Sequence, residues 1–279
     1  MKPDIYDLRS AIEFLKSQPG EYAETDVEVD PYCEITGVYR YLGAGAVVQR
    51  PTKKGPALMF NNIKGYSDAR CLIGILGSRQ RTANLFGTTP ENLSYFLKDC
   101  AEHPVWPVEV PRSEAKQTIT HYATEPDFDI RKYVPAAQAT PEDAGPYLTQ
   151  GLCYASDPET GESDVTIHRM CIQDKDTISF YIVPGGRHIG VFFEKACKMN
   201  IPLKMSINIG LDPAIYVGAC FEPPTTPLGY NELGVAGAIR QEPVKITACP
   251  SIPEKCIANA EFVIEAMLLP NETIAEDYT

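Results

Sequence analysis

The sequence is organised around Ser163–Met170 (SDVTIHRM), which is followed closely by Pro184–His188 (PGGRH). These two segments carry one carboxylate, two histidines and two arginines, among residues that otherwise have the apolar, β-branched character of buried strands. Charged and hydrogen-bonding side chains in a buried strand need partners or a ligand, because removing them from water is costly. We therefore expect a binding site here, with the preceding chain as its scaffold and the following chain as its second half.

The composition limits the class of protein. The chain has 279 residues, 44% of them hydrophobic, which is enough for one large or two ordinary domains with a true core. Its formal net charge of −12 argues against a nucleic-acid partner, which would need a basic face on the protein. The sequence has neither a signal-peptide pattern nor an apolar run of membrane-spanning length, so we expect a soluble, cytoplasmic protein without a membrane partner. Its nine cysteines are scattered singly, without a CxxC pair, and are expected to be free thiols.

The first part of the chain mixes helical and strand patterns. Periodicity and capping residues predict helices over 7–15, 78–86 and 89–101, and strands over 32–41 and 56–63. The proline-rich segment 104–111 cannot be helical and is interpreted as an extended linker. We place a domain boundary there, between residues 1–110 and residues 111–279.

Short strands predominate beyond this linker. They are predicted over 117–123, 147–154, 165–173, 177–182, 203–209 and 215–220, with one helix over 189–199. Glu261 and Glu265 flank a further strand-like run and are expected to be solvent-facing acids on an edge strand. The fold class is therefore predicted as α+β: a small α+β domain followed by a barrel-like sheet domain.

The surroundings of the four histidines and of Arg169 predict different roles for them. His103 is expected at the C-terminal end of a helix and His121 at the surface. His188 follows a Pro-Gly-Gly turn and begins a helix, features that let backbone approach a ligand. For His168, core packing and substrate contact remain equal alternatives. Arg169 either forms a core ion pair or is placed to bind a carboxylate, which its planar fork suits.

Several further patterns bear on the chemistry. The rigid loop 221–232 is of the kind that lines sites. Asp164, His188 and Glu232 come from three separated segments and would make a plausible site for a hard cation, although spacing alone does not establish it. The sequence contains no dinucleotide-binding GxGxxG, no phosphate-binding P-loop and no nucleophile elbow.

Seven stretches resemble the UbiD-type decarboxylases, most closely the large subunits of bacterial gallate (hydroxyarylic acid) decarboxylases. They are FNNIKGY, DAGPYLTQG, SDVTIHRM, PGGRHIG, INIGLDPAI, FEPPTTPLGYNELGVAGAIR and LPNETIAED. They are long and specific, and together they cover most of the chain from about residue 25 to its end.

The resemblance implies a split β-barrel flavin-binding domain behind the N-terminal α+β domain. It also implies prenylated FMN (prFMN) as the cofactor, Mn²⁺ bridging to the flavin phosphate, and K⁺ as an optional further cation. In this family a C-terminal α/β domain follows, and it is absent from this sequence. The metal ligands map onto Asp164, His188 and Glu232, where Asp164 replaces the commoner asparagine. The flavin contacts map onto Thr166, Ile167, Arg187 and His188.

The resemblance also implies the chemistry. Arg169 maps onto the catalytic arginine and Glu276 onto its acidic partner, while the family's second acid, the proton donor, would follow Thr279. The implied reaction is the non-oxidative, reversible decarboxylation of a hydroxyarylic acid such as gallate or protocatechuate, with Arg169 orienting the carboxylate. His168 is a candidate partner for phenolic hydroxyls.

Two functions follow as alternatives, each with its partners. The first is the decarboxylase, which would use a small aromatic acid, receive its cofactor from a flavin prenyltransferase and form a homo-oligomer when completed. The second is a non-catalytic flavin- or metal-binding fragment or subunit that needs a separate C-terminal half.

Overall fold

The computed structural model describes residues 3–42, 54–182 and 187–276. The helices are α1 (Leu8–Lys16), α2 (Glu34–Tyr41), α3 (Arg79–Phe86), α4 (Leu93–Glu102), α5 (His188–Met199), α6 (Pro213–Gly218) and α7 (Leu233–Arg240). The first strands are β1 (Tyr22–Thr25), β2 (Ala57–Phe60), β3 (Cys71–Ile73), β4 (Val108–Glu109), β5 (Tyr147–Leu148), β6 (Leu152–Ser156) and β7 (Ser163–Ile167). They are followed by β8 (Met170–Asp174), β9 (Thr177–Phe180), β10 (Leu203–Ile209), β11 (Lys245–Ala248), β12 (Lys255–Ile257) and β13 (Phe262–Leu268). None of the described helices is both long and apolar enough to cross a bilayer.

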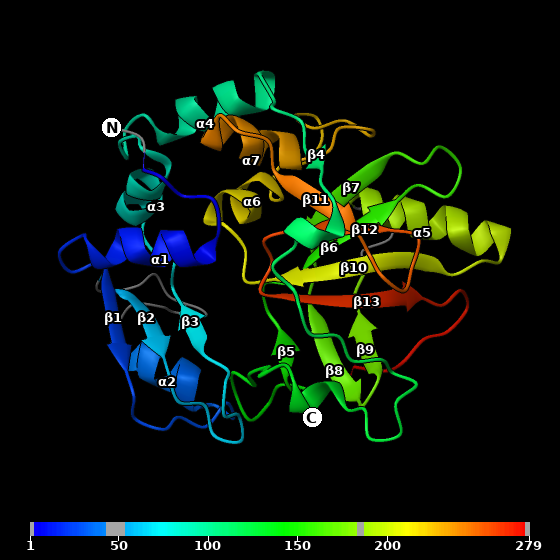
Figure 1. Cartoon of the computed structure of the whole chain (residues 1–279), viewed down its shortest axis with the longest axis horizontal. Coiled ribbons are helices and arrows are strands. Elements are labelled where there is room, and N and C mark those ends of the chain that lie inside the picture. The colour runs from blue at the N-terminus through cyan, green and yellow to red at the C-terminus, as the bar shows by residue number, and fades with distance from the viewer. Residues whose placement is uncertain (1–2, 43–53, 183–186, 277–279) are drawn as a thin grey trace.

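The protein is a mixed α+β structure, as predicted. The hydrogen-bond ladders between the described strands form the sheets β1-β2-β3, β13-β10-β6-β7, β12-β11-β4 and β5-β8-β9. The first sheet lies with α1, α2 and α3 on one side of the molecule, and the other sheets lie with α5 on the opposite side (Figure 1). Helices α4, α6 and α7 lie between these parts, at the top of the view.

The largest apolar core takes buried side chains from both sides of the predicted boundary. It includes Ala11 and Leu85 from the first part of the chain and Leu152 and Val235 from the second. The segment 104–111 is extended, as predicted, and within it β4 pairs in parallel with β11.

The predicted strand 165–173 is in fact two strands that belong to different sheets. β7 ends at Ile167 in the four-stranded sheet, and β8 begins at Met170 in the sheet with β5 and β9. His168 and Arg169 form the corner between them. Strand-forming residues on both sides of the corner, such as Val165, Ile167 and Ile172, concealed this break, because which sheet a strand joins is decided by distant segments. The predicted strand 147–154 is likewise divided, into β5 and β6.

Two other predicted strands are helices. Residues 32–41 contain α2, in which Ile35 and Tyr39 are buried one turn apart, so that a helical spacing was misread as strand propensity. Residues 215–220 overlap α6, where the Asp212 side chain accepts a hydrogen bond from the backbone N–H of Ala214 and Pro213 occupies the first turn. That local signal was present in the sequence.

The remaining differences concern boundaries. Residues 117–123 form neither strand nor helix, and the Gln117 amide instead donates to backbone carbonyls of 257, 258 and 260. The third predicted helix begins at Leu93, after Asn92, rather than at Thr89. By contrast α1, with Asp7 accepting from the backbone N–H of Ser10, is confirmed, as are α3, α5 and β10.

Candidate metal and cofactor site

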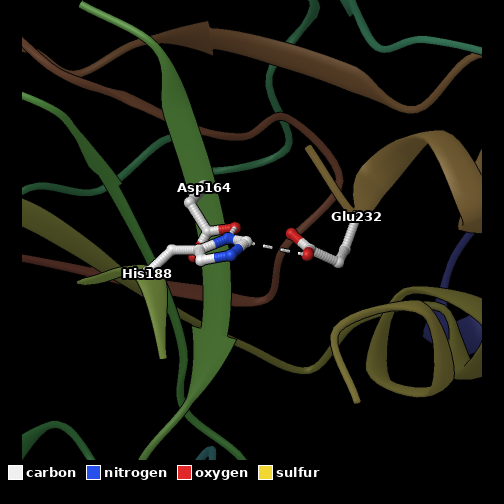
Figure 2. Close-up of side chains that lie close together, drawn as sticks. All are labelled: Asp164, His188 and Glu232. Carbon is white, nitrogen blue, oxygen red and sulfur yellow. Dashed lines mark hydrogen bonds and ion pairs between the residues drawn. The ribbon is translucent and has the colours of Figure 1, made fainter. Parts of the chain in front are cut away.

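Three buried side chains from separate elements meet at one point. Asp164 lies on β7, His188 is the first residue of α5, and Glu232 immediately precedes α7 (Figure 2). Their potential ligand atoms all lie within 4.8 Å of one another. The residues are only 2%, 7% and 2% exposed, respectively. The structure therefore brings together the three residues that the sequence proposed as metal ligands.

Local contacts hold the start of α7 against β7. The Asn231 amide donates to Ser163 Oγ at 2.9 Å, and its oxygen accepts from the backbone N–H of Leu233 at 3.0 Å. On the other side of Glu232, a Cβ placed on Gly218 of α6 would lie 2.9 Å from the Glu232 carbonyl oxygen. The backbone of Glu232 therefore lies close to both β7 and α6.

The three groups are electrostatically linked. His188 Nδ1 lies 3.2 Å from Asp164 Oδ1 and 3.9 Å from Glu232 Oε1. The hydrogen bond with Asp164 raises the pKa of His188. Burial, and then the nearby Asp164, raise the pKa of Glu232 well above its ordinary range. Two carboxyl groups forced together away from water favour a bound proton or a cation between them.

The donor set suits a divalent cation. Within the described part of the chain, Asp164 Oδ2, His188 Nε2 and Glu232 Oε2 are buried and have no hydrogen-bond partner. Buried polar atoms normally find partners, so three unpaired potential ligand atoms at one point indicate a missing group, and a cation that displaced their protons would contact all three. Two carboxylate oxygens with one imidazole nitrogen form a ligand set suited to ions such as Mn²⁺.

The polar surface continues beyond these three residues. Thr166 Oγ1, His168 Nε2 and Arg187 Nη1 are also buried without a partner among the described residues. Arg187 has a backbone φ of 58°, and its Nη2 lies 2.9 Å from Glu222 Oε1. An unpaired arginine N–H beside a cation site fits an anionic ligand such as a phosphate. Ile167, the other predicted flavin contact, is partly buried against the largest core.

Arg169 belongs to a second arrangement, on the other side of the corner. Its Nε lies 3.1 Å from Glu276 Oε1 and its Nη2 lies 3.4 Å from Glu276 Oε2. The guanidinium also lies 4.8 Å from the centre of the Tyr181 ring. The hydroxyl of Tyr147, on β5, donates to Glu276 Oε1. The structure therefore pairs the two residues that the sequence proposed as catalytic.

Arg169, Glu276 and Tyr181 line an open groove of about 1760 Å³. Tyr147 and Tyr181 were not identified from the sequence. Tyr147 stands in the DAGPYLTQG stretch, whose resemblance was the available signal, whereas nothing in the spacing indicated Tyr181. The two other histidines behave as predicted: His103 ends α4 and is exposed, and the His121 side chain is 40% exposed.

Comparison with known proteins identifies related domains over nearly the whole chain. A family model described as the 3-octaprenyl-4-hydroxybenzoate carboxy-lyase Rift-related domain matches residues 108–278. The model of the N-terminal domain of the same carboxy-lyase matches residues 12–98.

Individual relatives share both sequence and structure. Gallate decarboxylase of Lactiplantibacillus plantarum is 51% identical over 278 residues, which are 99% of this chain and 57% of that protein. The solved apo structure of Klebsiella pneumoniae 3,4-dihydroxybenzoic acid decarboxylase matches with 53% identity and a TM-score of 0.90, over 96% of this chain and 55% of the other.

A more distant relative has been solved with a cofactor. The UbiD-class enzyme HmfF of Pelotomaculum thermopropionicum, in an evolved dimeric form in complex with prFMN, matches with 28% identity and a TM-score of 0.84. That match covers 96% of this chain and 58% of the other. The chain thus spans little more than half the length of these relatives.

Proposed function

The chain belongs to the UbiD family of carboxy-lyases, and from this premise we propose that it serves the reversible, non-oxidative decarboxylation of a hydroxyarylic acid such as gallate or protocatechuate. The observation that carries the proposal is the buried group of Asp164, His188 and Glu232, with unpaired ligand atoms, one corner away from the Arg169–Glu276 pair. The named activities of the gallate and 3,4-dihydroxybenzoic acid decarboxylases support this substrate class.

We assign cofactor binding to the buried polar side chains around Asp164. Asp164, His188 and Glu232 would hold Mn²⁺, and Thr166, Ile167 and Arg187 would contact the flavin. When bound, prFMN supplies the electron sink for the bond that breaks. The negative charges of the carboxylates require the cation to be present before an anionic phosphate can approach them. K⁺ is a further cation that this acidic site could accept.

Arg169 is proposed to orient the substrate carboxylate. Its planar fork matches a carboxylate in two-point contact, and its present partner Glu276 is such a carboxylate. Tyr147 and Tyr181 would keep the guanidinium and Glu276 in position, by hydrogen bond and by ring contact respectively. Holding the carboxylate in one orientation favours loss of CO₂ because the bound substrate has less rotational entropy to lose on the way to the transition state.

Finer features of the assembly are proposed from the family alone. These are a split β-barrel as the architecture of the second part of the chain, a flavin prenyltransferase as the supplier of prFMN, a cytoplasmic location and a homo-oligomeric state. The dimeric form of the prFMN-bound relative supports the last of these.

A second candidate function is cofactor and metal binding without turnover, in a subunit that needs a separate C-terminal half. The observation behind it is that the candidate metal ligands lie together in the part of the chain that matches gallate decarboxylase, a match that covers 57% of that protein, so binding is the property that the match supports most directly. Both candidates require the same cofactor site, so they differ in catalysis and not in binding.

The test begins with co-expression of the chain with a flavin prenyltransferase. The purified protein should carry flavin absorbance and about one Mn²⁺ per chain, and CO₂ release from gallate and protocatechuate is then measured. A colourless, metal-free product would contradict both candidates. Turnover by the chain alone would support the decarboxylase and exclude the second candidate. Turnover only after the C-terminal part of a relative is added in trans would support the second candidate.

The Arg169→Ala variant tests the division of the site. In whichever form is active, we expect at least about a 100-fold fall in turnover with cofactor and metal content unchanged, because Arg169 would contact the substrate but neither the metal nor the flavin. His103→Ala, at an exposed helix end, is the control and should behave as the unaltered protein. Loss of flavin from the Arg169 variant would contradict the assignment.

A further inference from the structure

His168 presents a buried acceptor that nothing in the described part of the chain satisfies. The residue is 7% exposed, and its ring lies 4.4 Å from that of Phe180. His168 Nδ1 lies 3.3 Å from the backbone carbonyl oxygen of Tyr181. A carbonyl oxygen only accepts, so Nδ1 must carry the hydrogen. In the neutral ring the lone pair is then on Nε2, which has no partner.

The position of His168 connects it with the cofactor end of the site. Asp164 and Thr166 are spaced two apart on β7 and so share one face of it, and His168 stands at the corner that directly follows the strand. The charges of Arg187 and Asp164 both act on the His168 ring. Among the described residues, the lining of the groove includes Arg169 and its neighbours but not His168.

The chemistry of the unpaired atom limits its partner. A lone pair on Nε2 needs a donor, and a fully ionised phosphate offers only acceptor oxygens. A direct role as metal ligand is disfavoured, because the group of described ligand atoms within 4.8 Å of one another consists of Asp164, His188 and Glu232 without His168. A flavin nucleotide offers two kinds of donor, the N3–H of its ring and the hydroxyls of the ribityl chain that joins ring and phosphate. The ribityl hydroxyls are the donors next to the phosphate, which is the part of the flavin expected beside Arg187 and Asp164, and both of these act on the His168 ring.

We infer that His168 accepts, through Nε2, a hydrogen bond from a ribityl hydroxyl of the flavin, and so positions the cofactor and does not bind a substrate phenol. The inference rests on the proposed function, since it assumes that a flavin nucleotide occupies this surface. It assigns His168 to cofactor binding, in place of the two alternatives that the sequence left open, core packing and substrate contact.

Two substitutions separate this role from a structural one. Asparagine places its amide near the position of Nδ1, so His168→Asn can keep the donor to the Tyr181 carbonyl while it removes the distal acceptor. Glutamine reaches the position of Nε2, so His168→Gln can keep the distal acceptor while it loses the donor to Tyr181. A merely structural histidine would tolerate asparagine better than glutamine. A histidine that binds the ribityl chain would show the reverse order for flavin affinity.

The experiment measures the Kd of FMN in the presence of Mn²⁺, by quenching of flavin fluorescence. We expect His168→Asn to bind FMN about ten-fold more weakly, which corresponds to about 1.4 kcal/mol, and His168→Gln to bind within about two-fold of the unaltered protein. His103→Asn provides the same substitution at an exposed position and should change nothing. Thermal unfolding without ligand shows whether each variant is folded.

A modified ligand tests which group of the flavin is involved. An FMN analogue with a phosphorylated alkyl chain in place of the ribityl chain should bind the unaltered protein about ten-fold more weakly than FMN does, and His168→Asn should cause no further loss. An equal loss from His168→Asn with FMN and with the analogue would overturn the inference, as would unchanged FMN affinity in that variant. Failure of the unaltered protein to bind FMN with Mn²⁺ would overturn the proposed function as well.

Discussion

Asp164 and Glu232 are two carboxyl groups held in a space from which water is largely excluded. Such a pair is costly when both are ionised, and a cation between them offsets the repulsion. His188, already hydrogen-bonded to Asp164, completes a ligand set whose outer atoms find no partner within residues 3–42, 54–182 and 187–276. A bound cation is therefore expected to stabilise this part of the protein.

Glu232→Gln is predicted to weaken Mn²⁺ binding by at least about 100-fold, because it replaces an anionic ligand with a neutral amide of the same size. The metal-free variant should unfold at the same temperature as the unaltered protein or higher, since one of two facing carboxyl groups has been removed. Isothermal titration calorimetry with Mn²⁺ and a thermal melt give the two readouts. Glu13→Gln, at a side chain that is 71% exposed and belongs to α1, is the control. Unchanged affinity in Glu232→Gln would contradict the metal site.

His168 should also contribute to the pH dependence of stability. Burial lowers its pKa from 6.5 to about 4, so between these values the unfolded chain binds a proton that the folded protein does not. The free energy of unfolding must therefore fall as the pH drops through this window. We predict that the free energy of unfolding of the unaltered protein, measured relative to that of His168→Asn, falls by about 2 kcal/mol from pH 7 to pH 5. Urea unfolding of both proteins at each pH measures it, and a constant difference would exclude a neutral buried His168.

At the scale of elements, helix α7 carries Glu232 and is positioned by the linker segment that passes over it. A Cβ placed on Gly237 would lie 2.1 Å from the backbone carbonyl oxygen of Val105, and one placed on Gly234 would lie 2.8 Å from the Trp106 ring. The backbone N–H of Val105 donates to the carbonyl of Gly234 at 3.0 Å. The small residues on this face of α7 thus allow the close approach that holds the helix in place.

Gly237→Ala is predicted to destabilise the protein by about 2 kcal/mol or more, because the backbone that it would meet has no alternative rotamer. It should also weaken Mn²⁺ binding, since α7 must shift and Glu232 with it. Gly37→Ala, within α2 and with no atom inside 4 Å of its Cβ, is a matched control. It should stabilise the protein by up to about 1 kcal/mol, the helix preference for alanine over glycine. Urea denaturation compares the two, and equal effects would contradict the close packing of α7.

Across the whole molecule, an ion-pair cluster ties the first helix to the last strand. Arg9 donates to both carboxylate oxygens of Glu261, at 2.9 and 2.8 Å. Lys116 Nζ contacts Asp7 at 2.9 Å and Glu261 at 2.7 Å.

β13 is indeed an edge strand among the described strands, but the prediction that Glu261 beside it faces solvent was wrong. Its side chain is 19% exposed and forms ion pairs with both Arg9 and Lys116. Burial raises the pKa of Glu261, but its contacts with Arg9 and Lys116 outweigh this and lower it overall.

Glu261→Gln is predicted to lower the free energy of unfolding by about 1–2 kcal/mol at pH 7, because Lys116 and Arg9 each lose a partly buried partner. The lowered pKa means that this contribution is present above the ordinary carboxyl range and is lost as the pH falls through the folded value. Glu13→Gln, in an exposed pair with Lys16, should cost less than about 0.5 kcal/mol. Denaturation followed by circular dichroism and by the fluorescence of Trp106 measures both variants. An equally small effect at both positions would show that the cluster adds nothing.

Where information was local, the sequence was sufficient. The Asp7 cap and apolar spacing of α1, the helical pattern of α5 and the strand pattern of β10 were each predicted close to their bounds. The motifs also identified Asp164, His188 and Glu232 as a set, because each stands in a stretch whose residue types resemble one family. For α2 and α6, competing strand propensity concealed a helical signal that neighbouring residues already carried.

The sequence by itself identified the family and the candidate residues for the chemistry. The tertiary structure decided how they are arranged: the corner at His168 and Arg169, the contact of Tyr147 with Glu276, and the buried acceptors without partners. Side-chain burial and strand partners depend on segments that are distant in the chain, and an unsatisfied atom is defined only by everything packed around it. For that reason the polar stretch Ser163–Met170 could be recognised as a candidate site from its residue types. Only the tertiary structure showed that Asp164 lies with His188 and Glu232, whereas Arg169 lies with Glu276.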